Sequence, residues 1–322
     1  MSINLVNGFS DVLGSVNLAT NGRFIINQRS NFQTLTQVVV GDYVADAWKV
    51  DATTIDYIAC VQNVNGYIVF DGYGKKGQII RIKSKDGQLF GYSSLNSTTV
   101  NEKMPLTASI NAFNGVGVPI SVLASPRYYD GASEINVYQY RPTLNSGEQA
   151  MSVNVTRSYM NGGQTIYGGY FEVQLMADGK FNFTIEDFKE IAGGYRNPPT
   201  FAPVNYVDDL ARCERYYQKG NSGGHGSWHQ VPIVRNTNDY FSVSNYFRTT
   251  MAGIPTISVG NLEISLKQSA SIGSTSQQND HGNWTTSAQS PKNTGFRLDA
   301  NRNSLLGTYD VAQIHYDWAA EV

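Results

Sequence analysis

The chain carries little charge for its length. Asp, Glu, Lys and Arg make up only 16% of its 322 residues, and the formal net charge is −2. Proteins that bind nucleic acid usually present a strongly basic surface to the phosphates. The composition therefore argues against nucleic acid as a partner.

Cysteine is equally scarce. The two cysteines, Cys60 and Cys213, belong to no CxxC pair and to no Cys/His cluster of the kind that a zinc site needs. We expect two buried thiols that pack as small apolar side chains, no metal site and no cofactor. Whether the two thiols lie near each other stays open at this stage.

Long apolar runs are also missing. The amino-terminal segment lacks a basic stretch, and Asn, Ser, Asp and Gly interrupt it before an apolar core forms, so we expect no secretory leader. No run approaches the roughly 20 apolar residues that cross a bilayer. The sequence predicts a soluble chain that does not insert into membranes.

Glycine and tyrosine, by contrast, are abundant, with 31 and 20 residues. Many short strands joined by tight turns give such a composition, and a chain of this length usually forms two domains. We predict an all-β fold with an arm at 1–20, a jelly-roll β-sandwich at 21–192, a linker and helix at 193–220, and a smaller β-sandwich at 221–322. The apolar side chains of the arm suggest attachment or packing against another subunit.

The first sandwich is predicted from its strand patterns. More than ten short patterns follow one another without a helical one, which is typical of a two-sheet jelly roll. Trp48 lies in an alternating pattern and is expected in the core. Five glycine-containing pairs predict tight turns: Gly41-Asp42, Asn65-Gly66, Asp71-Gly72, Asp86-Gly87 and Asp178-Gly179.

One segment, Asn205–Gly220, predicts a capped amphipathic helix that joins the two sandwiches. Acidic residues lie in its first turn and basic residues towards its end, and Gly220 can end it. Asp208 and Arg212 stand one turn apart as an ion pair. The buried face is expected to contain Val207, Leu210, Cys213 or Ala211, and Tyr217. The residues predicted to form this helical joint are Asp208, Leu210, Arg212, Cys213 and Tyr217.

The second sandwich is predicted from a further set of strand patterns. Trp318 lies in one of them and is expected in the core. Residues 273–293 are mostly polar, which predicts a long exposed loop, and compact folds seldom keep such loops without a purpose.

Five segments carry a resemblance to a known family. They read LATNGRFIINQRS, VADAWKV, DDLARCERYYQK, FRTTMAGIPTISV and GFRLDANRNSLLGTYDVAQIHYDWAAEV, in this order. The residues of these segments and the order in which they follow one another resemble those of bacteriophage tail-fibre and receptor-binding proteins. The matching positions are Asn21, Gly22, Phe24, Gln28, Arg29, Asp46, Trp48, Leu210, Ala211, Cys213, Arg215, Tyr216, Tyr217, Arg248, Pro255, Thr256, Tyr316, Ala319, Ala320 and Glu321.

The resemblance implies a carbohydrate-binding-module-like jelly roll followed by a small tip domain. It also implies a homotrimer on a virion, with other tail proteins and a host surface polysaccharide as partners. The chain departs from the family in two places. Arg23 occupies a position that is often acidic in calcium-bound relatives, so a structural calcium is not carried over, and an Ala-Gly pair at 252–253 interrupts the family's strand.

No constellation of residues predicts catalysis. The adjacent carboxylates at 186–187 and 208–209 are not placed to act as acid and base across a bond. His225 and His229 lie four residues apart in a glycine-rich segment rather than on a helix, so they do not share a face as a zinc-binding pair would. We expect no catalytic residue.

Sugar recognition needs exposed aromatic rings with amide, carboxylate or hydroxyl groups beside them. The segments HGSWH at 225–229, NDHGNW at 279–284 and SPRYYDG at 125–131 supply both, although each tryptophan could instead anchor its loop on the core. The predicted glycan-binding residues are His225, Trp228, His229, Asp280, Asn283, Trp284, Tyr128 and Tyr129.

These features favour a tail-fibre or spike protein of a tailed bacteriophage that binds a host glycan without cleaving it. The alternative is a purely structural virion component, such as a collar, spike or head-decoration protein. A glycan-cleaving depolymerase is a third hypothesis, which neither a β-helix repeat nor a spaced carboxylate pair supports. The host, the glycan and the position on the particle stay open.

Overall fold

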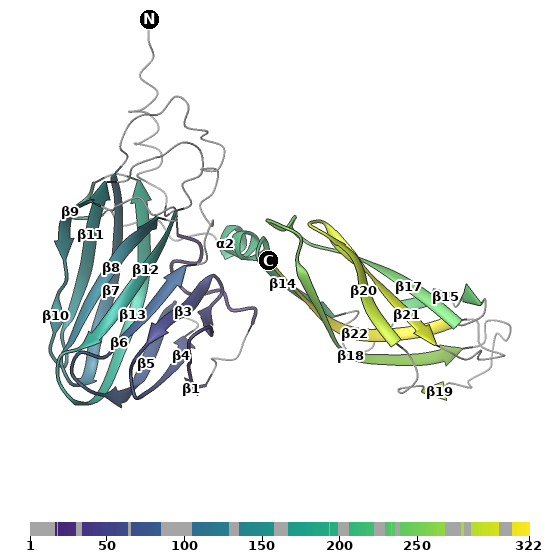
Figure 1. The fold of residues 1–322 in the computed structure, drawn as a ribbon, viewed down its shortest axis with the longest axis horizontal. Coiled ribbons are helices and arrows are strands. Elements are labelled where there is room, and N and C mark those ends of the chain that lie inside the picture. Colours follow the sequence, from purple (N-terminus) through teal and green to yellow (C-terminus); the bar gives the residue numbers. More distant parts are fainter. Residues whose placement is uncertain are drawn as a thin grey trace, which may run out of the picture. The chain divides into compact units, whose positions relative to one another are not determined.

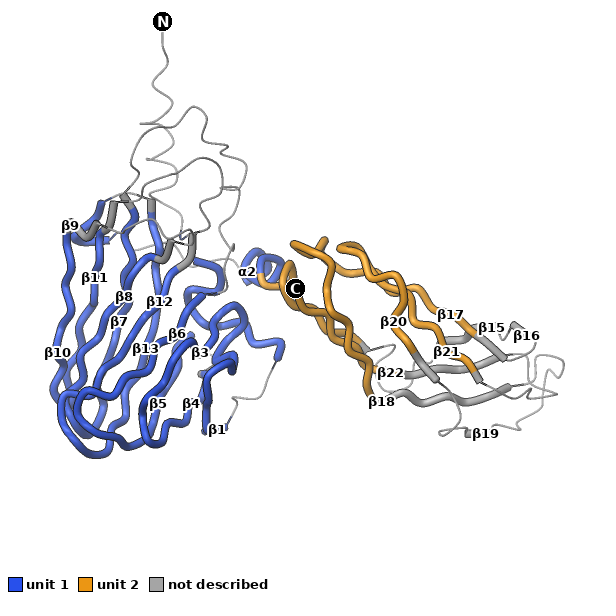
Figure 2. Tube along the Cα trace, in the orientation of Figure 1, with its two compact units in different colours: residues 1–212 blue, residues 213–322 orange. Residues whose placement is uncertain are grey.

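The fold is all-β, as predicted, and consists of two sandwiches of antiparallel strands with one α-helix in the described part of the chain (Figure 1). The chain divides into two compact units, residues 1–212 and 213–322 (Figure 2). The computed structural model describes residues 17, 19–29, 34–63, 66–84, 105–128, 135–157, 167–192, 194–198, 206–221, 229–232, 234–235, 239–267, 278–279, 285–302 and 311–322. None of the helical residues among these forms a segment long and apolar enough for a membrane span.

The first unit is a jelly-roll β-sandwich of two antiparallel sheets (Figure 1). The seven-stranded sheet has the spatial order β1 (Thr36–Gln37), β4 (Tyr57–Asn63), β5 (Tyr67–Gly74), β13 (Gly179–Ala192), β7 (Pro105–Gly117), β11 (Gln149–Arg157) and β9 (Ile135–Tyr140). The six-stranded sheet has the order β10 (Thr143–Leu144), β8 (Ile120–Tyr128), β12 (Tyr167–Leu175), β6 (Ile79–Ser84), β3 (Trp48–Thr53) and β2 (Tyr43–Ala45). The inward faces of the two sheets enclose the core, and their outward faces point in opposite directions.

Aromatic side chains from both sheets fill the core of the first unit. Trp48 is fully buried, as predicted, and its ring centroid lies 5.3 Å from that of Phe24 and 4.7 Å from that of Phe188. Phe70 and Phe183 stack at 5.0 Å. Burying one phenylalanine side chain contributes about 1.5–3 kcal/mol, so these rings are a main source of the stability of the sandwich.

The TNG segment, which opens the resemblance described above, has a structural role. Asn21 is fully buried with a φ of +51°, and its amide donates to the carbonyl oxygen of Asp46 at 2.8 Å. The indole N–H of Trp48 donates to the carbonyl oxygen of Asn21 at 3.1 Å. A Cβ atom at Gly22 would lie 2.3 Å from the carbonyl oxygen of Phe188, so only glycine fits there.

Asn17 ties the beginning of the described chain to the end of the sandwich. Its side-chain amide donates to the carbonyl oxygen of Phe188 at 2.9 Å, and its side-chain oxygen accepts from the backbone N–H of Glu190 at 3.0 Å. Both partners lie on β13. These bonds hold the first segment against the last strand of the unit.

The tight turns predicted in this unit are partly confirmed. Gly41 and Gly66 adopt φ angles of +103° and +92° in turns, which favour glycine. The prediction for Asp71-Gly72 is wrong, because both residues lie inside β5. A Cβ atom at Gly72 would lie 2.1 Å from the carbonyl oxygen of Tyr57, so this glycine permits close packing rather than a turn. The turn predicted at Asp86-Gly87, between β6 and β7, lies outside the described residues.

The second unit is a smaller β-sandwich, as predicted. Its five-stranded sheet contains β14 (Tyr217–Asn221), β22 (Val311–Glu321), β18 (Thr256–Lys267) and β19 (Gln278–Asn279) in this order, with β15 (His229–Pro232) also paired to β22. Its four-stranded sheet has the order β16 (Val234–Arg235), β17 (Asp239–Tyr246), β21 (Gly295–Arg302) and β20 (Thr285–Lys292). The core contains Phe241, Phe296, Leu298, Ala300 and Tyr316, with Trp318 packed against it.

The prediction of a long loop at 273–293 is wrong for two segments, because Gln278–Asn279 form β19, paired with β18, and a second strand follows. Residues Thr285–Lys292 form β20, which pairs with β21 at the edge of the four-stranded sheet. An edge strand with polar side chains lacks the apolar alternation by which strands are recognised, and charged or proline residues there protect the edge.

The connecting helix is shorter than predicted. α2 spans Tyr206–Glu214, and Tyr217 begins β14, so the prediction is wrong for the last residues of the segment. Gly220 lies opposite Trp318 in the pairing of β14 with β22, and a Cβ atom there would lie 2.8 Å from the indole ring. This glycine therefore allows close packing in a sheet and does not end a helix.

Contacts within α2 also differ from the prediction. Arg212 Nη1 pairs with Asp209 Oδ1 at 3.3 Å rather than with the preceding aspartate. Cys213 is buried as expected and Leu210 is half-buried, whereas Val207 is 66% exposed and does not belong to a buried face. The predicted N-cap lies outside the described residues, and the boundary between the two units falls within this helix.

Candidate functional site

Most of the predicted glycan-binding residues lie outside the described residues. These are His225, Trp228, Tyr129, Asp280, Asn283 and Trp284. The backbone of His229 begins β15 opposite Ile314, and the backbone of Tyr128 ends β8 opposite Tyr167, but their side chains are not described. The three loop sites therefore stay predictions.

Two stacked tyrosines lie on the outward face of the seven-stranded sheet. Tyr57 on β4 and Tyr73 on β5 are cross-strand partners, with ring centroids 5.5 Å apart and planes inclined by 14°. Residues of β5 alternate strictly, so that Ile68 and Phe70 are buried while Tyr73 is 52% exposed. The sheet thus carries a stacked pair of aromatic rings on its outward face, of which Tyr57 is half-buried and Tyr73 is exposed.

Polar side chains surround this aromatic pair. Asp71 lies two residues before Tyr73 on the same face, and Asn182 of the adjacent β13 donates to Asp71 Oδ2 at 3.3 Å. Lys180 lies opposite Tyr73 on β13 and is exposed. Residues two apart in a strand are about 7 Å apart, which is within reach of one sugar ring and its hydroxyl groups. We call Tyr57, Tyr73, Asp71 and Asn182 the tyrosine platform.

The tyrosine platform offers the chemistry that a sugar requires. Aromatic rings contact the apolar C–H face of a pyranose, the carboxylate accepts hydrogen bonds from hydroxyl groups, and the amide both donates and accepts. Because β5 is hydrogen-bonded on both sides, to β4 and β13 (Figure 1), little ordering is needed before a ligand binds.

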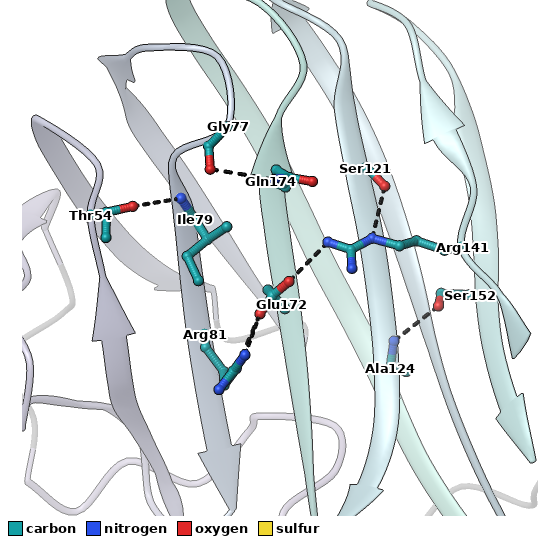
Figure 3. A network of polar contacts seen from close by, with 10 residues as sticks. All are labelled: Thr54, Gly77, Ile79, Arg81, Ser121, Ala124, Arg141, Ser152, Glu172 and Gln174. Carbon is teal, nitrogen blue, oxygen red and sulfur yellow. Dashed lines mark hydrogen bonds and ion pairs between the residues drawn. The ribbon is translucent and has the colours of Figure 1, made fainter. Parts of the chain in front are cut away.

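A second polar cluster lies on the outward face of the six-stranded sheet. Glu172 of β12 lies between two arginines, with Oε2 2.7 Å from Arg81 Nη2 and Oε1 2.9 Å from Arg141 Nη2 (Figure 3). Arg141 Nε also donates to Ser121 Oγ at 3.0 Å. We call Arg81, Glu172 and Arg141 the arginine cluster. It links β6, β12 and the segment between β9 and β10.

The arginine cluster combines a buried carboxylate with two partly exposed guanidinium groups. The Glu172 side chain is only 9% exposed, whereas those of Arg81 and Arg141 are 37% and 29% exposed. Burial opposes the charge of Arg81, but the hydrogen bond and negative charge of Glu172 outweigh it and raise the pKa of Arg81. The Arg81 guanidinium also lies 5.0 Å from the centroid of the Tyr170 ring.

Other carboxylates take part in contacts that hold the fold. Asp187 has a φ of +57° in the irregular part of β13 and pairs with Lys189 Nζ at 2.9 Å. Burial raises the pKa of Asp209, against the lowering effect of the Arg212 charge and of the Asn21 backbone N–H. In the part of the chain that the structure describes, no group of three or more His, Cys, Asp or Glu side chains is placed to hold a metal ion.

Neither cysteine forms a disulfide, and both are buried. This agrees with their predicted role as packing residues. Burial, with a smaller effect from the charge of Asp42, raises the pKa of Cys60 to about 12. Cys60 is therefore a thiol rather than a thiolate at neutral pH.

Comparisons with known proteins give no family. No protein-family model and no curated protein sequence matches the chain. Among solved structures, the CBM22-1–CBM22-2 tandem domain of Xyn10C from Paenibacillus barcinonensis is 10% identical, with 91% of both chains covered and a TM-score of 0.27. Discoidin II of Dictyostelium discoideum is 11% identical, with 95% of this chain and 92% of that chain covered and a TM-score of 0.20. These scores are too low for either likeness to carry an argument.

Proposed function

We propose that the protein is a glycan-binding protein without catalytic activity and that it uses the tyrosine platform to bind a sugar. The observation that supports this most directly is the stacked pair of Tyr57 and the exposed Tyr73 on the outward face, beside the Asp71–Asn182 pair. Exposed aromatic rings cost free energy in water, and a sugar face that covers them recovers part of it.

Binding without cleavage also fits the contacts of three carboxylates, Glu172, Asp209 and Asp71. Glycoside hydrolysis needs two carboxyl groups that face each other across an open site, on the order of 5–9.5 Å apart. Glu172 is held by two arginines and Asp209 by Arg212. Asp71 is the carboxylate of the platform, and Asn182 beside it can bind a sugar but cannot exchange a proton.

We further propose that the protein is part of a bacteriophage tail fibre or spike, as a homotrimer on the virion. Support comes from the residues and the order of the five segments that resemble tail-fibre and receptor-binding proteins. Several weak sites presented together on one fibre would bind a polysaccharide far more tightly than one site does. The structural virion component remains the alternative, and the loop residues around Trp228 and Trp284 remain candidate contacts at other sites.

The experiment compares two exposed tyrosines in the full-length chain. Tyr73 and Tyr206 are 52% and 53% exposed, so each can be replaced by alanine with a similar change in surface. We expect Tyr73→Ala to reduce binding on a glycan array and to host cells at least roughly tenfold, a loss of about 1.4 kcal/mol. Tyr206→Ala should leave binding unchanged.

Three other outcomes would decide between the alternatives. Equal effects of the two variants would exclude the platform as the site. No binding to any glycan, combined with the presence of the protein in purified particles, would favour a structural component. Release of reducing sugar by the wild-type chain would contradict the absence of catalysis.

A further inference from the structure

The arginine cluster lies on a surface whose charge differs from that of the whole chain. By strand register, Lys49, Arg81 and Lys83 project from the outward face of the six-stranded sheet, together with Asp51 and Glu172, and Arg141 reaches over it. Among the described side chains of this face, four positive and two negative charges leave an excess of two positive charges, whereas the whole chain has a net charge of −2. Lys83 pairs with Asp51 at 2.7 Å, so the excess belongs to Lys49 and the arginine cluster.

The two guanidinium groups are held close together with donors to spare. Each binds a different oxygen of the single Glu172 carboxylate, so the bound nitrogens of Arg81 and Arg141 are at most about 8 Å apart. Each guanidinium has five N–H groups and uses only its Nε and Nη2 in the contacts with Glu172 and Ser121, which leaves Nη1.

Such an arrangement is suited to an anion. Guanidinium groups bind carboxylates and phosphates through paired, charge-assisted hydrogen bonds, and the buried Glu172 fixes both groups before a ligand arrives. A neutral hydroxyl group would gain less from two charges. The Glu172 charge also limits the affinity, because it already neutralises one of the two arginines.

We propose that the arginine cluster is a binding site for a small oxyanion, such as the carboxylate of an acidic sugar or a phosphate group carried by a surface polymer. The site lies on the sheet opposite to the one that carries the tyrosine platform, and it does not rest on the function proposed for the platform. Arg81 and Arg141 provide the donors, and Glu172 positions them.

The test titrates the full-length chain, labelled with ¹⁵N, with glucuronate and in parallel with glucose. These sugars differ only in a carboxylate or a hydroxymethyl group, so the comparison isolates the charge. The Nε–H signals of Arg81 and Arg141 are assigned from their loss in Arg81→Gln and Arg141→Gln. Glucuronate should shift both signals saturably, glucose should shift neither, and Arg141→Gln should weaken the binding of glucuronate at least tenfold.

Inorganic phosphate, titrated in a third series, identifies the source of the oxyanion. Phosphate binding without glucuronate binding would keep the site and assign it to a phosphate-bearing ligand. If neither anion gives a saturable shift in the wild-type chain, the proposal is overturned, and this result needs no variant. Tyr73→Ala leaves the arginine cluster intact, so a failure of the platform and a failure of this site can be told apart.

A matched control separates binding at the arginine cluster from a general effect of charge. Lys292→Gln removes one exposed positive charge from β20 of the second unit and should leave the affinity for glucuronate unchanged. Equal weakening by Lys292→Gln and Arg141→Gln would overturn the proposal.

Discussion

The carboxyl group of Glu190 should make the first unit less stable as the pH rises. Glu190 lies on β13, is 1% exposed, and has one oxygen, Oε1, without a hydrogen-bond partner. Its Oε2 would lie 3.6 Å from a Cβ atom at Gly169 on the facing sheet, which places the group inside the sandwich. Burial raises the pKa of Glu190 to about 8, from an ordinary value of 4.5.

The sign and size of the effect follow from proton linkage. Because the folded pKa is above the unfolded one, the folded chain keeps a proton that the unfolded chain loses between pH 4.5 and 8. The stabilising effect is complete below pH 4.5 and disappears as the pH rises to 8, by about 1.4 kcal/mol per pH unit. Between pH 5.5 and 7.5 the wild-type unit should lose about 2.5 kcal/mol from this group.

Glu190→Gln removes the titration and keeps the shape of the side chain. The free energy of unfolding of the first unit would be measured in urea at both pH values, by pulsed hydrogen exchange read on peptides from β7 and β13, because two units need not unfold together. The pH-dependent loss should be about 2.5 kcal/mol smaller in Glu190→Gln than in the wild type.

Glu148→Gln serves as the control, because Glu148 lies on the surface and should leave the slope unchanged. An identical slope in wild type and Glu190→Gln would refute the reasoning. Should that variant fold poorly, ¹³C detection of a glutamate carboxyl group that titrates near pH 8 in the wild type tests the same claim.

Three further outcomes are expected. Gly22→Ala should destabilise the first unit by about 3 kcal/mol or more, because its Cβ would meet the Phe188 carbonyl. Gly77→Ala, where only the φ of +87° is unfavourable, should destabilise it by about 1 kcal/mol. Equal losses of the two variants in urea unfolding would contradict this reasoning. In folded protein, iodoacetamide should label Cys60 about a thousandfold more slowly than in urea, since its pKa is about 12 instead of 9.0, and rapid labelling of the native chain would argue against that burial. Trp228→Ala and Trp284→Ala should weaken adsorption to host cells if their loops contact the glycan, and unchanged adsorption by both would remove those two sites.

The sequence predicts the architecture well where burial imposes a period. Alternating strands, the buried Trp48 and the smaller second sandwich all follow from such patterns. The pattern fails where a glycine has a packing role, since it predicts breaks at Gly72 and Gly220 and both residues lie in strands. It fails again at β20, whose edge position removes the need for apolar residues.

Neither surface of the candidate site could be predicted from the sequence. Tyr57 and Tyr73 are separated in the chain and meet only through the register of β4 with β5. Glu172 likewise meets Arg81 and Arg141 only because β12 lies beside β6 and β8. Aromatic and polar residues that are neighbours along the chain are typical of binding loops. In a sheet, strand pairing brings together residues that are far apart in the sequence, and the sequence alone does not show this.

The two bonds of Asn17 have a consequence for the order in which this protein matures. Its partners Phe188 and Glu190 follow it by 171 and 173 residues. During synthesis at the ribosome, Asn17 cannot form these two hydrogen bonds until nearly the whole first unit has emerged. The contact between the segment at Asn17 and β13 therefore forms late, and closing a loop of this length makes folding slow.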